Sequence, residues 1–408
     1  MNWGGFSLKR ADFVCVCLLS VLMALACLFF YNDKEDVALM AFADEGNSCE
    51  ALWQDSLPAM ANSAKHAALL DAEGRLLWGK DANTPAGMAS TTKIMTAFLA
   101  AEYIESVGED AVTLVSDKAA GIEGSSIYLK VGETVRLMDL LYATLLASAN
   151  DAAAALAEAV AGSQDAFVRL MNERVCEWGL DQTHFVNVHG LSDKEHYTTA
   201  YELGVIASHA LQNELFAHVV STKHYTFAGE GITRQIANHN RMLSSYQGAI
   251  GVKTGFTKAT GRCLVSAAER EGVMLIAVTL SAPDDWNDHA ALLDYGFSRL
   301  EKRLLLRKNE ISLTLPVVCG AASCVAVTNA KEASVVLPKG QGELTQRVEL
   351  LPFAYAPIAK GSAVGQVVFY DEAGKAVATC ELVAIEAVEA IEYEKTLSER
   401  ILSFFGLR

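Results

Sequence analysis

Three short motifs, in a fixed order along the chain, constrain this sequence more than any other feature. They are Ser90-Thr91-Thr92-Lys93, Ser148-Ala149-Asn150 and Lys253-Thr254-Gly255. They fit the patterns S-x-x-K, S-x-N and K-T-G. Each is short enough to arise by chance, but S-x-x-K and K-T-G occur only once each in the 408 residues, with S-x-N between them. The ordered set therefore predicts one active site built from three distant segments.

The first motif supplies a nucleophile and a base. The pattern from Thr91 to Ile104 predicts a helix, which puts Ser90 at its N-terminus and Lys93 one turn later on the same face. A serine hydroxyl attacks well only when a neighbouring base removes its proton. Lys93 can do so only as a neutral amine, which burial or a second cation such as Lys253 would favour. A plain helix cap is the structural alternative for Ser90.

The other two motifs complete a site for acyl transfer. We expect Ser148 to pass a proton to the leaving amine and Asn150 to hold Lys93 and the substrate amide. Substrate binding falls to Lys253, Thr254, Gly255 and Phe256. In that group the cation and hydroxyl would bind a substrate carboxylate, and the backbone N–H groups of Ser90 and Phe256 would stabilise an oxyanion. The predicted substrate is an acyl donor with a free carboxylate, such as a peptide C-terminus.

The start of the chain predicts export. The uncharged apolar run from Phe13 to Tyr31 is long enough to span a membrane and follows Lys9 and Arg10. Residues 1–45 are therefore expected to be an export signal or a membrane anchor, and the Ala41-Phe42-Ala43 cleavage signature leaves both open. The net charge of −16 argues against a nucleic-acid partner.

The nine cysteines and nine histidines show no metal-binding spacing. His184, His189 and His196 lie near one another in sequence, but structural roles are favoured over a metal site. Cys319 and Cys324 could bridge a short loop, although unpaired thiols are the simpler interpretation. No metal is therefore expected.

Periodicity predicts a mixed α+β chain. Residues 67–77 indicate a hairpin, and residues 135–161 indicate two helices with Ser148-Ala149-Asn150 at the break and Asp151 as a cap of the second. Three neighbouring antiparallel strands are expected at 249–254, 263–268 and 273–280, followed by a helix over 284–304. Short β-like runs between 305 and 390 indicate a small all-β domain. Residues 391–408 read as an amphipathic tail that lies on a membrane or docks on the β domain.

Longer segments around the motifs resemble the serine D-alanyl-D-alanine carboxypeptidases, the low-molecular-weight penicillin-binding proteins. The similar segments are Met88–Ala97, Gly124–Leu129, Ser148–Ala152, Asn187–Leu191, His196–Ala200, Asn238–Leu243, Gly251–Thr257 and Leu292–Phe297. The resemblance implies a penicillin-recognising fold, with an antiparallel sheet, helices on both faces and a small all-β domain after it. It also implies removal of the terminal D-alanine from peptidoglycan stem peptides through an acyl-Ser90 intermediate. β-Lactams would acylate the same serine, and no cofactor is implied.

The resulting domain prediction is an export segment at 1–45, a catalytic domain at 46–303, a β-sandwich at 304–390 and a tail at 391–408. The enzyme is expected outside the cytoplasm, at the cell membrane or wall. Arg262 departs from the aromatic residue that such enzymes often have there. The sequence leaves open whether water or another stem peptide is the acceptor.

Three other functions share part of this pattern. A class A β-lactamase shares the motifs but would want an acidic residue at Ala149 and a deacylating glutamate, which is not found. A zinc-dependent carboxypeptidase would need His/Asp ligand spacing. A catalytically silent wall-binding or penicillin-sensing module has little support, because Ser90 and Lys93 are both present.

Overall fold

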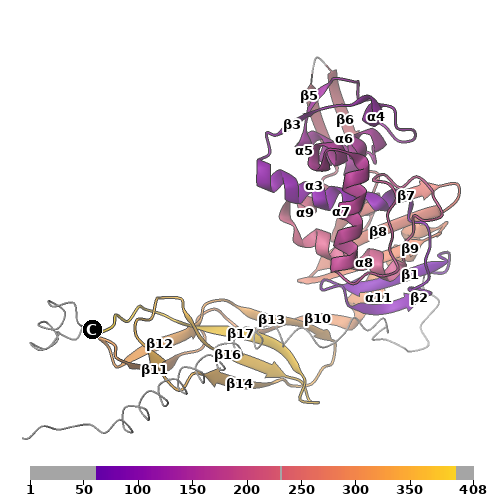
Figure 1. The fold of residues 1–408 in the computed structure, drawn as a ribbon. Coiled ribbons are helices and arrows are strands. Elements are labelled where there is room, and N and C mark those ends of the chain that lie inside the picture. The colour runs from indigo at the N-terminus through magenta and orange to yellow at the C-terminus, as the bar shows by residue number, and fades with distance from the viewer. Residues whose placement is uncertain (1–60, 230–231, 392–408) are drawn as a thin grey trace, which may run out of the picture. The chain divides into compact units, whose positions relative to one another are not determined.

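The computed structural model describes residues 61–229 and 232–391 (Figure 1). The expected export segment at 1–45 and residues 392–408 of the expected tail lie outside the described residues. Within the described part of the chain, no helix is long and apolar enough to cross a membrane.

The centre of the catalytic region is a five-stranded antiparallel sheet in the order β2-β1-β9-β8-β7. Its strands are β1 (His66–Asp71), β2 (Leu76–Lys80), β7 (Ala249–Thr257), β8 (Gly261–Arg270) and β9 (Val273–Leu280). The predicted hairpin is β1–β2, and the three predicted neighbouring strands are β7, β8 and β9. Both predictions are confirmed.

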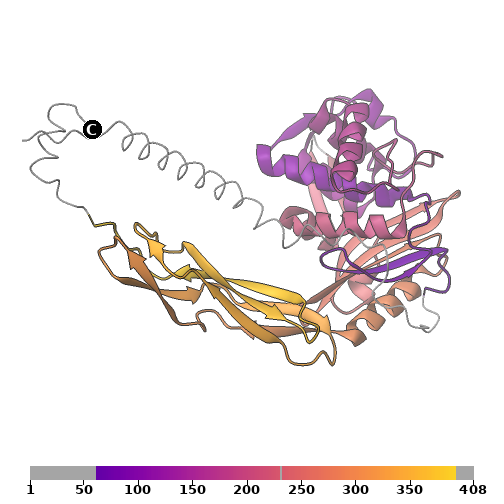
Figure 2. The same ribbon diagram turned by 60° about the horizontal axis from the view of Figure 1, so that its bottom comes forward.

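Helices cover both faces of this sheet, as Figures 1 and 2 show. Helix α8 (Ala200–Gln212) packs on one face and α11 (Asp285–Arg299) on the other. Side chains alternate between the faces along a strand, so the consecutive residues Leu69 and Leu70 of β1 point to opposite faces. A Cβ added at Gly204 of α8 would lie 2.3 Å from Leu70 Cδ1, and one added at Gly296 of α11 would lie 3.1 Å from Leu69 Cδ2. Glycine at both positions therefore lets each helix approach the sheet closely.

Most of the remaining helices form a cluster beside the sheet (Figure 1). They are η1 (Ala89–Thr92), α3 (Lys93–Val107), α4 (Asp117–Ala120), α5 (Leu137–Leu146), α6 (Asn150–Ala161), α7 (Gln164–Glu177) and α9 (Glu214–Ser221). The short helix α10 (Met242–Ser245) contacts β7 instead, and its Met242 shares a core cluster with Leu292 and Leu293 of α11. Two short hairpins complete the region, β3 (Val112–Leu114) with β4 (Thr134–Arg136), and β5 (His224–Gly229) with β6 (Ile232–Ala237). Residues 93–101 of α3 are buried on every face, so α3 is the central helix and not a surface helix with one apolar stripe.

Two predicted boundaries were wrong. Ser90 does not begin the α-helix, because it lies in the 3₁₀ turn η1 and the helix starts at Lys93. The helix expected over 284–304 ends at Arg299, and the chain continues as strand β10 (Leu300–Leu306). Strand β10 pairs along its length with β13 (Ala333–Pro338). A partner distant in sequence thus selects strand over helix there.

The C-terminal part is an all-β domain, as predicted. Besides β10 and β13 it contains β11 (Leu313–Val318), β12 (Cys324–Asn329), β14 (Thr345–Leu350), β15 (Ala354–Tyr355), β16 (Ala363–Tyr370) and β17 (Ala376–Ala384). Six strands form one sheet in the order β14-β16-β17-β12-β11-β15. Apolar side chains such as Leu315, Val325 and Leu382 form its core. Cys319 and Cys324 are exposed free thiols, so they are not bridged in this structure.

Candidate active site

Lys93 lies at the centre of a hydrogen-bonded cluster that joins the first two motifs. Its Nζ is 3.2 Å from Ser90 Oγ, 2.7 Å from Asn150 Oδ1 and 2.6 Å from the carbonyl oxygen of His189. The side chain is fully buried. Two of these partners are carbonyl oxygens that can only accept, so the third direction of the amine faces the Ser90 hydroxyl. This geometry orients the amine toward the Ser90 hydroxyl.

The electrostatics of the cluster favour a neutral amine. Burial lowers the pKa of Lys93 well below its ordinary value, and the charge of Lys253 lowers it further, while Asp151 acts in the opposite direction. Burial also lowers the pKa of Lys253 to about 7. Two buried lysines near one another therefore make a proton on Lys93 costly. A neutral Lys93 is what a base for Ser90 requires.

The S-x-N motif lies at the break between α5 and α6, as predicted. Ser148 has a φ of 58°, a conformation that non-glycine residues adopt rarely and mostly at functional sites. The Asn150 amide is oriented from both ends, because its Oδ1 accepts from Lys93 and its Nδ2 donates to the carbonyl oxygen of Glu123 at 2.6 Å. A Cβ at Gly124 would lie 2.6 Å from Asn150 Nδ2, so glycine is needed there.

Asp151 is not the helix cap that the sequence indicated. It lies in the first turn of α6, and the residue at the N-cap is Ala149. The buried Asp151 carboxylate instead accepts hydrogen bonds from the hydroxyl of Ser126 at 2.6 Å and from the backbone N–H groups of Ile127 and Leu129 at 3.2 and 3.0 Å. It thereby fixes the segment after Gly124 against the S-x-N motif.

The K-T-G motif lies on β7, the edge strand of the central sheet, and this strand contacts η1. A Cβ at Gly255 would lie 3.1 Å from the backbone nitrogen atoms of Ser90 and Thr91. Glycine at 255 therefore keeps a side chain away from the Ser90 N–H, the group expected to bind an oxyanion. Phe256 is the next residue, and its side chain is 65% exposed.

Two histidines support the turn that holds Ser90, and the motif analysis did not predict this role. The buried His196 ring accepts the Val186 N–H at Nδ1 (3.1 Å), so its Nε2 carries the proton and donates to Thr92 Oγ1 at 2.7 Å. The Thr92 hydroxyl donates to the carbonyl oxygen of Ala89. His189 contributes a backbone carbonyl to Lys93. Only their position within the segments similar to the carboxypeptidases could have indicated them.

Among the described residues, no group of three or more His, Cys, Asp or Glu side chains is placed to hold a metal ion.

Arg262, where such enzymes often have an aromatic residue, has partners of its own in this structure. It donates to Asp285 Oδ1 at 2.8 Å and lies over the ring of Trp286, 5.5 Å from its centroid. Arg262 therefore connects β8 to the start of α11, and on the sheet it pairs with Phe256 of β7.

Comparison with known proteins decides the family. Residues 54–284 match the D-alanyl-D-alanine carboxypeptidase family of S11 peptidases, and residues 300–390 match the C-terminal domain of penicillin-binding protein 5. The chain belongs to the D-alanyl-D-alanine carboxypeptidase family. It is a serine-type peptidase, and the matches do not favour the β-lactamase or silent-module alternatives.

Curated relatives and solved structures agree. The carboxypeptidase is 31% identical to D-alanyl-D-alanine carboxypeptidase DacF of Bacillus subtilis over 76% of its own length and 82% of that protein. It is 32% identical to DacC of Escherichia coli over 82% and 87% of the two chains. The structure of penicillin-binding protein 5 from Haemophilus influenzae covers 82% of this chain with a TM-score of 0.63 at 27% identity. PBP3 from Streptococcus pneumoniae covers 80% with a TM-score of 0.69 at 27% identity. Those two solved chains are each covered over 99% of their length.

Proposed function

We propose that this carboxypeptidase removes the terminal D-alanine from peptidoglycan pentapeptide stems through an acyl-Ser90 intermediate. The observation that carries the assignment of roles is the bridging amine of Lys93, which contacts both Ser90 Oγ and Asn150 Oδ1. A buried amine with a lowered pKa, within reach of a serine hydroxyl, fits a general base.

In the first half-reaction the neutral Lys93 amine takes the Ser90 proton as Oγ attacks the scissile carbonyl. The carbonyl oxygen becomes an oxyanion held by the N–H groups of Ser90 and Phe256. Ser148 then donates its proton to the departing amine and is reprotonated by Lys93, so that the C–N bond breaks, D-alanine leaves and Lys93 is neutral again. In the second half-reaction the neutral Lys93 takes a proton from water as the water attacks the acyl-Ser90 ester, and it returns that proton to the Ser90 oxygen when the ester bond breaks.

Recognition of the substrate falls to the K-T-G strand. Lys253 and Thr254 bind the terminal carboxylate, with Lys253 in its charged form once the anion is present. Gly255 keeps the approach to the Ser90 N–H open, and Asn150 Nδ2 lies beside the substrate amide. β-Lactams mimic the same acyl donor and acylate Ser90.

The place of action follows the chemistry of the substrate, since peptidoglycan lies outside the cytoplasm. We assign residues 1–45 as the export signal or anchor, 46–303 as the catalytic domain, 304–390 as the β-sandwich and 391–408 as an amphipathic tail. The apolar run from Phe13 to Tyr31 behind Lys9 and Arg10 supports export.

The direct test is release of D-alanine from an N-acylated Lys-D-Ala-D-Ala peptide by the protein lacking its first 45 residues, alongside Ser90→Ala. We expect release by the parent and a loss of at least about a thousandfold in the variant, because removing an enzyme's nucleophile commonly costs that much or more. The variant should also fail to form a covalent penicillin adduct in mass spectrometry. A folded parent that releases no D-alanine would contradict the proposal.

A further inference from the structure

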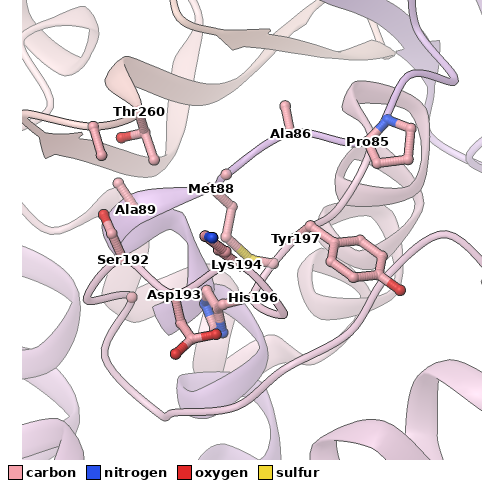
Figure 3. A pocket seen from close by; sticks show the side chains of 13 residues that line it. Pro85, Ala86, Met88, Ala89, Ser192, Asp193, Lys194, His196, Tyr197 and Thr260 are labelled. Carbon is pink, nitrogen blue, oxygen red and sulfur yellow. The ribbon is translucent and has the colours of Figure 1, made fainter.

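Tyr128 is the most exposed large hydrophobic residue of those that the structure describes, with 84% of its surface accessible. It lies in the segment after Gly124, between α4 and β4. No side chain of the described residues forms a hydrogen bond or a ring contact with its own side chain. By contrast, Tyr197 at the pocket beside the Ser90 turn (Figure 3) is half-buried, and its ring lies 6.0 Å from that of His184. Tyr128 therefore presents an aromatic ring to solvent, and the mechanism above does not use it.

The backbone at Tyr128 has a conformation that suits glycine better than tyrosine. Its φ is 58°, in the left-handed region that a bulky residue rarely occupies. Glycine adopts this conformation without a steric cost. Strained residues of this kind persist where the surrounding structure enforces them, and they cluster at functional sites. An exposed side chain adds little packing to the fold, so the fold by itself gives no reason for a tyrosine here.

Hydrogen bonds on both sides of Tyr128 fix this backbone. Its N–H donates to Ser126 Oγ at 2.8 Å, and its carbonyl oxygen accepts from Arg234 Nη2 at 3.2 Å. The N–H groups of the residues before and after it both donate to the Asp151 carboxylate, at 3.2 and 3.0 Å. Arg234 is buried and is paired in turn with Glu133. The ring thus projects from a preorganised backbone, which lowers the entropy cost of binding a ligand.

The segment that carries Tyr128 also contacts the active site. The carbonyl oxygen of Ser125 accepts the Asn150 N–H at 2.7 Å, and Asn150 Oδ1 and Ser90 Oγ both contact the Lys93 amine. Tyr128 is three residues farther along the chain, at most about 11 Å from Ser125. In the proposed reaction four residues of the pentapeptide stem lie on the acyl side of the scissile bond, and when extended they span about 14 Å. A sugar at the start of the stem can therefore reach Tyr128 while the scissile carbonyl lies at Ser90.

The chemistry of an exposed tyrosine fits such a sugar. One face of a pyranose ring consists of C–H groups with partial positive charge, which pack on the negative face of an aromatic ring. Ser125 and Lys130 are exposed on either side of Tyr128 and can bond to the hydroxyl and acetamido groups at the rim of the sugar. A sugar and a protein could both stack on the ring. Of these two partners, the proposed function brings the sugar to the site with every stem.

We propose that Tyr128 stacks on an N-acetylated amino sugar of the glycan strand, so that the enzyme binds a stem attached to glycan more tightly than a free peptide. The inference rests on the proposed function, because the reach to Tyr128 starts from an acyl chain at Ser90. The contact lies away from the reacting bond and stabilises the bound substrate and the transition state equally. It should therefore change KM and not kcat.

The test measures kcat and KM for D-alanine release from a pentapeptide stem and from the same stem attached to its N-acetylglucosaminyl-N-acetylmuramyl disaccharide. We expect the parent protein to have the lower KM on the disaccharide substrate. Tyr128→Gly should raise that KM about fivefold, the size of one aromatic stacking contact, and should leave the free pentapeptide unchanged. Glycine suits a φ of 58°, so this variant should be at least as stable to heat as the parent. Tyr128→Phe keeps the ring and should keep the preference.

Tyr355→Ala is the matched control, since Tyr355 is an exposed tyrosine of the all-β domain. It should change neither KM. Equal KM values of the parent on the two substrates would overturn the stacking role and favour a protein partner for Tyr128. A loss in Tyr128→Gly that the two substrates share would also overturn it, because the variant would then disturb the active site itself. Release of D-alanine from neither substrate would instead contradict the proposed function, and the stacking role would fall with it.

Discussion

At the scale of single residues, the proposed mechanism gives two buried lysines different tasks. In that mechanism Lys93 must lose its proton to act as a base, whereas Lys253 must keep its proton to bind a carboxylate. The charge of Lys253 is one of the causes that lower the pKa of Lys93. Under the proposed roles, the residue that binds the substrate carboxylate thus also lowers the pKa of the base.

This coupling makes a directional prediction. Lys253→Gln removes a positive charge near Lys93, so the pKa of Lys93 should rise and less neutral amine should be present at a given pH. The acidic limb of the pH profile of Ser90 acylation should then move to higher pH, in addition to the loss of rate from weaker carboxylate binding. Stopped-flow acylation by a β-lactam between pH 5 and 10 measures it. An acidic limb that stays in place in Lys253→Gln would contradict the coupling. Lys258→Gln, which removes the charge of an exposed lysine on the same hairpin, is the control and should leave the limb in place.

The contacts of Lys93 with Ser90 and Asn150 could be predicted from the motifs, because acyl transfer needs a hydroxyl beside a base and the short patterns contain both. The partners that come from outside the motifs could not. Asp151 looked like a local cap, but its carboxylate bonds residues 126–129, more than 20 positions earlier in the chain. The carbonyl of His189, 96 positions from Lys93, leaves no trace in any side-chain pattern.

At the scale of elements, the approach of β7 to η1 sets the geometry of the site. Gly255→Ala would place a Cβ 3.1 Å from Ser90 N, tighter than an ordinary contact, so the strand or the turn must shift. We expect kcat/KM to fall by about tenfold to a hundredfold, since removing one oxyanion donor entirely costs about a hundred- to a thousandfold. D-Alanine release measures the effect. Gly229→Ala is the control, because its Cβ would meet only the carbonyl oxygen of Thr134, at 3.8 Å.

Elements with local signals were predicted, and those with distant partners were not. The β1–β2 hairpin carries its turn at Glu73 and Gly74, next to its strands. The β5–β6 hairpin was missed. Its Arg234 is buried and donates to Glu133 at 2.6 Å and to the carbonyl oxygen of Ile127 at 3.0 Å. From the sequence alone, an arginine is expected at the surface, because nothing near it in the chain shows that an acidic partner 101 positions away will be buried with it.

At the scale of the whole molecule, three buried neutral histidines connect the fold to pH. Burial lowers the pKa of His189 and His196 to about 4 and that of His289 to about 3. The His289 ring lies between two strands, with Nδ1 2.5 Å from Ser266 Oγ and Nε2 2.9 Å from Thr279 Oγ1. In the unfolded chain the same rings titrate near their ordinary value of 6.5. Between these values the unfolded state binds more protons than the folded state.

The sign of the effect follows by linkage. The stabilising contribution is complete above about pH 6.5 and is lost as the pH falls toward the folded values. We expect each such histidine to cost roughly 1 kcal/mol of unfolding free energy between pH 7.5 and 5.5. His289→Gln, although less stable at every pH, should therefore show a shallower decline over this interval than the parent. Urea unfolding at several pH values gives the slopes. The exposed His218→Gln should keep the parent slope, and an unchanged slope in His289→Gln would mean that this ring is not held neutral by the fold.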